Sequence, residues 1–81
     1  MGQWEEYLEK IRNNPRNARF DDILNLLRHY GFHIRPGKGS HYVASCGRYR
    51  IVIVRENPVK IPYVRQCINA IDAVTEEDSD E

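Results

Sequence analysis

The stretch Tyr49-Arg50-Ile51-Val52-Ile53-Val54 decides the fold of this 81-residue chain, because it is the most β-prone segment of the sequence. The tripeptide Cys46-Gly47-Arg48 before it can form only a tight connection, and a second β-prone segment begins near His41. Two such segments joined by so short a link predict a β-hairpin. Asn57-Pro58 ends the later strand.

Upstream of this hairpin, Phe32 and Ile34 alternate with His33 and Arg35, which is the period of a short strand. The segment Pro36-Gly37-Lys38-Gly39 then turns the chain. The sequence therefore predicts three antiparallel strands in succession.

Three helices are predicted around these strands. Residues 20–30 place apolar side chains at intervals of three and four, and Gly31 follows as the expected C-terminal cap. Residues 3–13 form a shorter amphipathic helix. A last helix has Pro62 in its first turn and an apolar face made of Val64, Cys67, Ile68, Ile71 and Val74.

The order helix, helix, three strands, helix indicates an α+β fold. A lone three-stranded sheet needs one covered face, so we expect the helices to pack together on that face and to leave the other open. Residues 1–74 form a single domain, in which Asn13 to Arg19 are the candidate hinge after the first helix. The acidic residues 75–81 are expected to be a disordered tail.

The net charge of zero hides a strong asymmetry, because five of the twelve acids occupy the last six residues. Without that tail, twelve basic residues face seven acids, which gives a charge near +5. Between Arg28 and Arg65, eight basic residues face the single acid Glu56. This asymmetry indicates a polyanion partner, although a solvated basic face without a ligand explains it equally well.

Other features exclude classes of protein. The longest apolar run is the four residues Ile51 to Val54, so we expect no membrane span and no signal peptide, and a soluble intracellular protein. Cys46 and Cys67 form no Cys-x-x-Cys pair and have no histidine pair at ligand spacing, which argues against zinc and a disulfide. We expect both to be reduced, with Cys67 in the core. The scattered carboxylates favour chemistry without a metal or another cofactor.

The turn that ends in Lys38-Gly39-Ser40-His41 suits an anion, because its glycines allow a close backbone approach and its lysine can reach a phosphate. No helix begins there as in a P-loop, and ordinary hairpin turns also collect glycine. His41 can remain exposed at the start of its strand, where a histidine can transfer protons near neutral pH. His29 and His33 are expected to be surface residues.

Arg48 and Arg50 share one strand face by the two-residue period, opposite Tyr49, so they can line the open face of the sheet. The alternative is an edge strand that charge protects from aggregation. Tyr42 and Tyr63 can stack on unpaired bases or contribute to the core.

The run Phe20-Asp21-Asp22-Ile23-Leu24-Asn25-Leu26-Leu27-Arg28-His29-Tyr30-Gly31-Phe32, followed by Lys38-Gly39-Ser40-His41, resembles the HicA toxins of toxin-antitoxin pairs. In that family an amphipathic helix ends in Gly-Phe, and a Gly-Ser-His turn opens the second strand. Pro62-Tyr63-Val64-Arg65-Gln66 is similar to the entry to the last helix in longer members. The resemblance spans Phe20 to Val74, about two thirds of the chain.

The resemblance implies a double-stranded-RNA-binding-like fold and a cytoplasmic, ribosome-independent endoribonuclease (mRNA interferase) that cleaves mRNA. It also implies neutralisation by a HicB-like antitoxin that covers the active site. The family's catalytic histidine falls on His41, with Gly39 and Ser40 shaping the turn. The first helix has no counterpart in the shortest members, and residues 55–61 depart from their pattern.

RNA can be cut without a metal when its 2′-hydroxyl attacks the adjacent phosphate. Our hypothesis is that His41 acts as general acid or base, while Lys38 and either Arg48 or Arg50 stabilise the phosphate charge. A non-catalytic RNA-binding module of the same fold and a protein-interaction domain with an acidic partner are the alternatives. The first usually needs more lysines at the start of the last helix than Lys60 and Arg65 supply.

Overall fold

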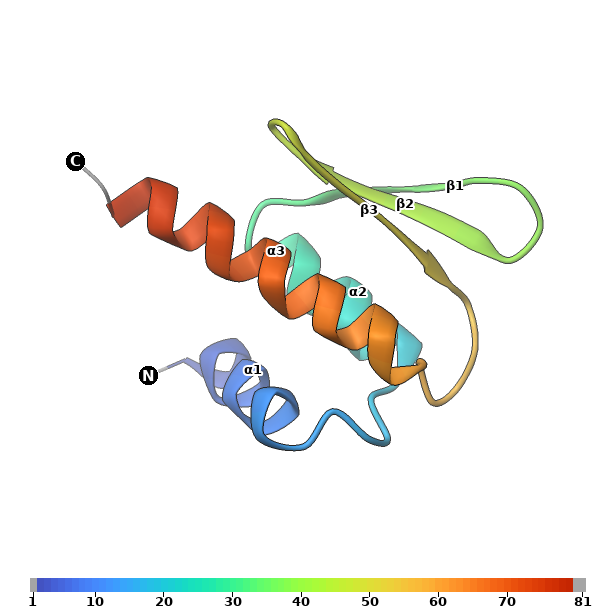
Figure 1. Cartoon of the computed structure of the whole chain (residues 1–81), viewed down its shortest axis with the longest axis horizontal. Helices are drawn as coiled ribbons and strands as arrows, with labels where there is room; N and C mark the ends of the chain where they lie inside the picture. The colour runs from blue at the N-terminus through green and yellow to red at the C-terminus, as the bar shows by residue number, and fades with distance from the viewer. Residues whose placement is uncertain (1, 80–81) are drawn as a thin grey trace.

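The computed structural model describes residues 2–79 of the chain. Its elements in order are α1 (Gln3–Asn13), α2 (Phe20–His29), β1 (His33–Pro36), β2 (His41–Cys46), β3 (Tyr49–Val54) and α3 (Ile61–Ser79), as Figure 1 shows. The strands form one antiparallel sheet in the order β1-β2-β3. The predicted α+β class and the predicted element order are confirmed.

The end of α2 shows why a glycine was expected there. Gly31 has a φ of +94°, in a region that residues with a side chain rarely adopt. Its N–H donates to the carbonyl of Arg28 at 3.0 Å, and the N–H of Phe32 donates to the carbonyl of Leu27 at 3.0 Å. These bonds satisfy the last carbonyls of the helix and direct the chain into β1.

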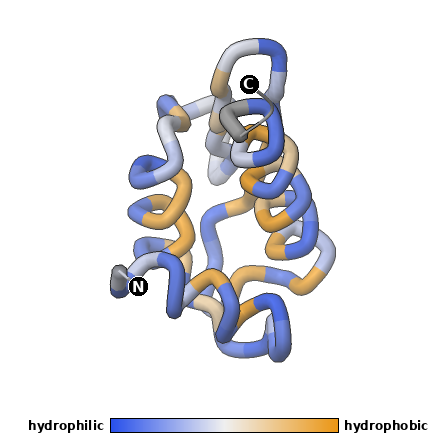
Figure 2. The backbone as a smooth tube through the Cα atoms, turned by 90° about the vertical axis from the view of Figure 1, so that its left-hand side faces the viewer, coloured by the Kyte–Doolittle hydropathy of each residue, from blue (hydrophilic) through white to orange (hydrophobic). Residues whose placement is uncertain are grey.

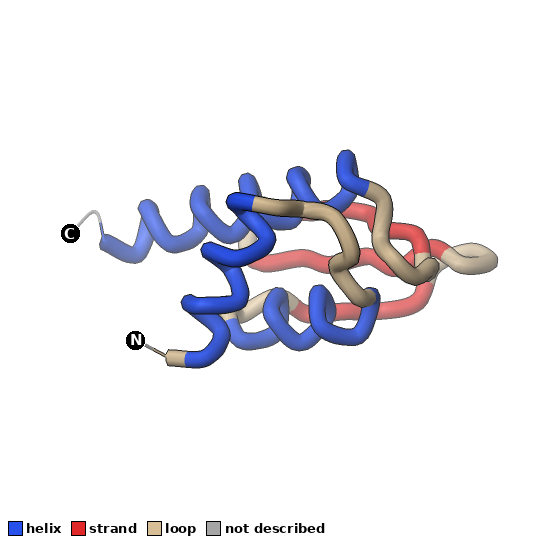
Figure 3. Tube along the Cα trace, turned by 90° about the horizontal axis from the view of Figure 1, so that it is seen from below, coloured by secondary structure: helices blue, strands red, loops and turns tan. Residues whose placement is uncertain are grey.

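The helices lie on one side of the sheet, as predicted, and form two layers there. α2 contacts β1 and α3 contacts β3, so these two helices cover one face of the sheet. α1 contacts α2 and α3 and crosses their outer side, away from the sheet (Figure 3). Within the described residues no helix covers the opposite face, which we call the open face (Figure 1).

The core lies between the helices and the covered side of the sheet. Figure 2 shows hydrophobic residues that recur turn by turn along the helices. The fully buried members of this core include Ile23, Leu26, Leu27, Ile53, Val64, Cys67 and Ile71. Burial raises the pKa of the Cys67 thiol to about 12, so this side chain is a neutral core group. Both cysteines are free, and Cys67 is in the core, as predicted.

α1 is attached to the rest of the protein by apolar and ionic contacts. Leu8 and Ile11 are buried, and the Arg12 guanidinium donates hydrogen bonds of 2.7 and 2.8 Å to the two carboxylate oxygens of Asp72 on α3. The candidate hinge is also anchored, because the N–H of Val59 donates to the carbonyl of Ala18 at 2.8 Å. These contacts fix the first helix against the domain.

The pair of Arg12 and Asp72 makes the stability of the fold depend on pH. The hydrogen bond from Arg12 is the main cause of the lowered pKa of Asp72. A carboxyl group whose pKa is lowered in the folded state stabilises the fold at pH values above its pKa in the unfolded chain, which is about 3.9. This stabilisation is lost as the pH falls through the pKa of the folded state.

We therefore expect Asp72→Asn to lower the free energy of unfolding by about 0.5–1 kcal/mol at neutral pH, since both side chains are partly exposed to solvent. At acid pH, as Asp72 becomes protonated, the difference in stability between the two proteins should shrink. Urea denaturation at the two pH values measures the difference, and the same loss at both would contradict the assignment.

The structure corrects the prediction of a disordered acidic tail. α3 continues through residues 75–79, so the prediction is wrong there, while residues 80 and 81 lie outside the described residues. Glu77 on this last part of α3 accepts a hydrogen bond of 2.9 Å from Arg48 and another from the hydroxyl of Tyr49. These contacts tie the end of the helix to the hairpin between β2 and β3.

Candidate nucleic-acid interface

The side chains of the open face form three rows across the strands. Strand alternation and the pairing register put every second residue of each strand on this face. The rows consist of Gly37, His41 and Val54; Arg35, Val43 and Val52; and His33, Ser45 and Arg50. Because no Asp or Glu occurs between residues 33 and 55, the charged groups of this face are all basic.

The turn before β2 fixes the orientation of the His41 ring. The carbonyl of Lys38 lies 3.0 Å from the backbone nitrogen of His41 and 3.1 Å from its ring Nδ1. A carbonyl only accepts hydrogen bonds, so Nδ1 carries the proton and donates it. In the neutral ring Nε2 then has the free lone pair, and the side chain is exposed. His41 therefore presents Nε2 as a proton acceptor on a basic surface.

The conformation of this turn requires Gly39. Its φ is +57°, whereas a Cβ placed there would meet no atom within 4 Å, so only the backbone conformation demands a glycine. Gly47, in the turn between β2 and β3, has the same properties, with a φ of +58° and open space around it. The two glycines are matched positions at opposite ends of β2.

We expect Gly39→Ala and Gly47→Ala each to lower the free energy of unfolding by about 1–2 kcal/mol, the usual cost of a side chain in this conformation. Only Gly39→Ala should also change the ¹⁵N signals of the His41 ring, because only this turn supplies the bond to Nδ1. Urea denaturation and NMR spectra of the variants measure both effects. Equal ring signals in the two variants would show that the turn does not orient His41.

Two cations near His41 were not among the residues selected from the sequence. Arg35 lies opposite Val43, diagonally across from His41 at about 7–8 Å for such strand neighbours. The N–H of Arg55 donates to the carbonyl of Ser40 at 2.8 Å, which places this exposed arginine beside the turn. Lys38, Arg35 and Arg55 are thus neighbours of the histidine along the turn and the sheet. A predicted pairing register for the two strands that flank the turn would have identified Arg35 as a neighbour of His41.

Arg50 lies on the open face, as predicted, but far from His41. It pairs with Ser45, and it is four residues along β3 from Val54, the partner of His41. Four residues of strand span about 13 Å. Arg50 therefore belongs to the opposite end of the face.

Arg48 does not lie on the open face, so this part of the prediction is wrong. It occupies the turn before β3, where the alternation of the strand no longer applies. Its guanidinium donates to the Tyr49 hydroxyl at 3.3 Å and to Glu77 at 2.9 Å, on the side covered by α3. The structure thus brings Lys38, Gly39, Ser40 and His41 together but leaves both hairpin arginines at the other end of the sheet.

The remaining histidines and tyrosines have different surroundings. His33 is exposed, and the exposed ring of His29 lies 6.4 Å from Trp4 and 4.9 Å from Tyr30 between ring centres. Both are surface residues, as predicted. Tyr42 and Tyr63 are half-buried against the core, and the ring of Tyr42 lies 5.2 Å from that of Phe20. The core interpretation of these two tyrosines is therefore the correct one.

Three valines give the open face an apolar strip. Val43 is only 8% exposed, yet it is separate from the core cluster beneath the sheet. Val52 and Val54 are half-buried beside it on β3. A surface that combines such a strip with basic side chains at both ends suits a ligand with a charged backbone and apolar planar groups, or an apolar partner with an acidic rim.

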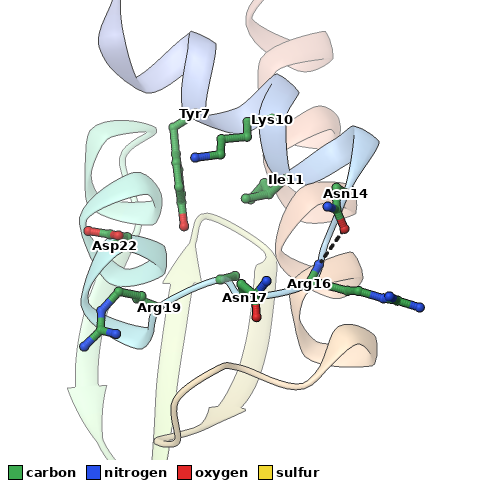
Figure 4. Close-up of a pocket in the computed structure, with 9 residues that line it drawn as sticks. Tyr7, Lys10, Ile11, Asn14, Arg16, Asn17, Arg19 and Asp22 are labelled. Carbon is green, nitrogen blue, oxygen red and sulfur yellow. Dashed lines mark hydrogen bonds between the residues drawn. The ribbon is translucent and has the colours of Figure 1, made fainter.

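A cavity of about 340 Å³ lies on the helical side of the molecule, away from these rows. Tyr7, Lys10, Asn14, Asn17 and Asp22 are among the residues that line it. Figure 4 shows that the side chains of Arg16 and Arg19, whose residues also border the cavity, extend away from it. Burial and then the charge of Asp22 raise the pKa of Tyr7, which keeps its hydroxyl neutral. The charged residues that line the cavity include both Lys10 and Asp22, whereas those of the open face are all basic.

Among the residues whose side chains are described, no group of three or more His, Cys, Asp or Glu side chains could hold a metal ion. No helix of the described chain has both the length and the apolar composition needed to cross a membrane. Comparisons with protein-family models, with characterised proteins and with solved structures found no match.

Proposed function

We propose that this chain is a cytoplasmic toxin of the HicA type, a metal-independent endoribonuclease that cleaves mRNA and is neutralised by a HicB-like antitoxin. The observation that carries the proposal is the His41 ring, whose Nδ1 donates to the Lys38 carbonyl and whose Nε2 is free on an exposed basic surface. The resemblance of residues 20–32 and 38–41 to HicA toxins supports the same activity.

The reaction needs no external nucleophile, because RNA carries its own 2′-hydroxyl. Nε2 of His41 accepts the proton of this hydroxyl while the oxygen attacks the adjacent phosphorus. The bond to the 5′-oxygen breaks, and the leaving oxygen takes a proton from solvent. The products are a 2′,3′-cyclic phosphate and a 5′-hydroxyl. The side chains of Lys38 and Arg35 stabilise the negative charge that builds up on the phosphate oxygens.

The apolar strip on the open face favours a second candidate, a protein-interaction domain without nuclease activity. Val43, Val52 and Val54 offer a partner an apolar contact, and the surrounding arginines suit an acidic rim. In the toxin proposal the antitoxin occupies the same face. The two candidates therefore differ in the fate of RNA rather than in the presence of a protein partner.

The test incubates the purified chain with a mixed-sequence RNA oligonucleotide in EDTA and identifies the ends of the products by mass spectrometry. We expect fragments that end in a 2′,3′-cyclic phosphate and begin with a 5′-hydroxyl. The matched control is the same oligonucleotide with 2′-O-methyl riboses, which should bind without being cut because it lacks the nucleophile.

Other results would overturn the proposal in distinct ways. Intact RNA that still binds the protein indicates an RNA-binding module, and intact RNA without binding leaves the protein-interaction domain. Cleavage of the 2′-O-methyl oligonucleotide would rule out the mechanism above.

A further inference from the structure

The two edges of the sheet expose different main-chain groups. The N–H of Arg55 donates to the carbonyl of Ser40, just before β2, and hydrogen-bonded pairs alternate along an antiparallel ladder. The groups of residues 49, 51 and 53 therefore point to β2, whereas those of Arg50, Val52 and Val54 point outward from the sheet. β3 is an edge strand, so within the part of the chain that the structure describes these outward N–H and C=O groups have no strand partner.

The edge at β1 is protected by its proline and its short length, whereas β3 carries Arg50 as its one charged residue. The bond from Gly37 to His41 directs the groups of His33 and Arg35 toward β2, which leaves Ile34 and Pro36 as the outward positions of β1. Pro36 has no N–H to donate, and the strand has only four residues. β3 has six residues and no proline, and it offers three outward donors and three outward acceptors.

We propose that β3 pairs antiparallel with β3 of a second copy of this chain, with Val52 opposite Val52, to form a continuous six-stranded sheet. This register uses all the outward groups of both strands, because Arg50 of each copy then lies opposite Val54 of the other. The alternative with Arg50 opposite Arg50 would leave Val54 unpaired and place two like charges together.

Apolar side chains also fit the same register. At the centre, the half-buried Val52 of each copy covers that of the other. The two-fold axis of such a pair is perpendicular to the sheet, so both open faces, each with its His41, lie on the same side of the dimer.

The proposal is tested by sedimentation velocity of the full chain over about 1–200 μM, a range in which mass action populates a weak dimer. The variants are Val52→Pro and Val52→Ala. Both lose the valine side chain, but only proline also loses the outward N–H, which the fold of one copy does not use. We expect the wild type and Val52→Ala to reach twice the 9.5 kDa chain mass and Val52→Pro to remain monomeric.

A wild-type protein that stays monomeric over the whole range, or a dimer that survives Val52→Pro, would overturn the proposal. Hydrogen exchange of the wild type gives a second readout that does not depend on the folding of a variant. The amides of Arg50, Val52 and Val54 should exchange more slowly at high than at low protein concentration. An exchange rate that is independent of concentration would also contradict the pairing. Neither measurement involves RNA, so both are independent of the proposed function.

Discussion

Replacing His41 with alanine is expected to lower the rate of RNA cleavage by about 10²–10⁴-fold, the usual contribution of a positioned general base. The exposed His41 side chain lies outside the core cluster, and its ring is hydrogen-bonded to the carbonyl of Lys38. The fold should therefore be preserved, and the free energy of unfolding should change by less than about 0.5 kcal/mol. Expression of the variant should not arrest growth, whereas expression of the wild type should.

The matched control for this experiment is His33→Ala. His33 is an exposed histidine on the same face, but it lies two rows away from His41, beside Ser45. The His33→Ala variant should cleave RNA at a rate within about threefold of the wild type, because His33 touches neither the turn nor the reacting groups. Equal cleavage by wild type and His41→Ala would remove His41 from the mechanism, and equal loss in both variants would point to a general effect of charge on RNA binding.

Replacing Leu27 with alanine is expected to lower the free energy of unfolding by about 2–5 kcal/mol. Leu27 is fully buried in the core between α2 and the sheet, and its carbonyl accepts the bond from Phe32 that ends the helix. A chain of this size is stabilised by roughly 4–12 kcal/mol in total, so this one change removes a large share. Urea denaturation followed by circular dichroism measures the loss.

Asn25→Ala is the control on the same helix. Asn25 is exposed, and its side chain only accepts a 3.3 Å hydrogen bond from Arg28. Its replacement should change the free energy of unfolding by no more than about 0.5 kcal/mol. If Leu27→Ala were equally mild, the space that it leaves would have to be refilled by neighbouring side chains, and the core would be more plastic than the structure indicates.

Most of the fold could be predicted from local sequence patterns. The bounds of α1 and β3 agree with the prediction, because each has a clear period and a recognisable stop signal at its end. β2 begins at His41 as expected, but it also includes Cys46, which was expected in the connection. Gly31 ends α2 as expected. Such signals act within one or two turns of chain, so they can be read without the tertiary structure.

The candidate site was only partly predictable. Lys38, Gly39, Ser40 and His41 are consecutive, so one turn holds them together whatever the rest of the chain does. Which other cations come near depends on strand register, and register joins residues that are separated in sequence. For that reason the sequence suggested Arg48 and Arg50, whereas the pairing brings Arg35 closer to His41.

The sequence by itself determined the helices, the strands and the turn that carries His41, because these follow from neighbouring residues and the propensities of the backbone. Only the tertiary structure decided that α1 forms a second layer, that α3 extends past Val74 to bind Arg48, and that β3 is the edge strand without a proline. These features arise from contacts between distant segments. Packing and pairing between such segments depend on the whole arrangement, which local periodicity does not encode.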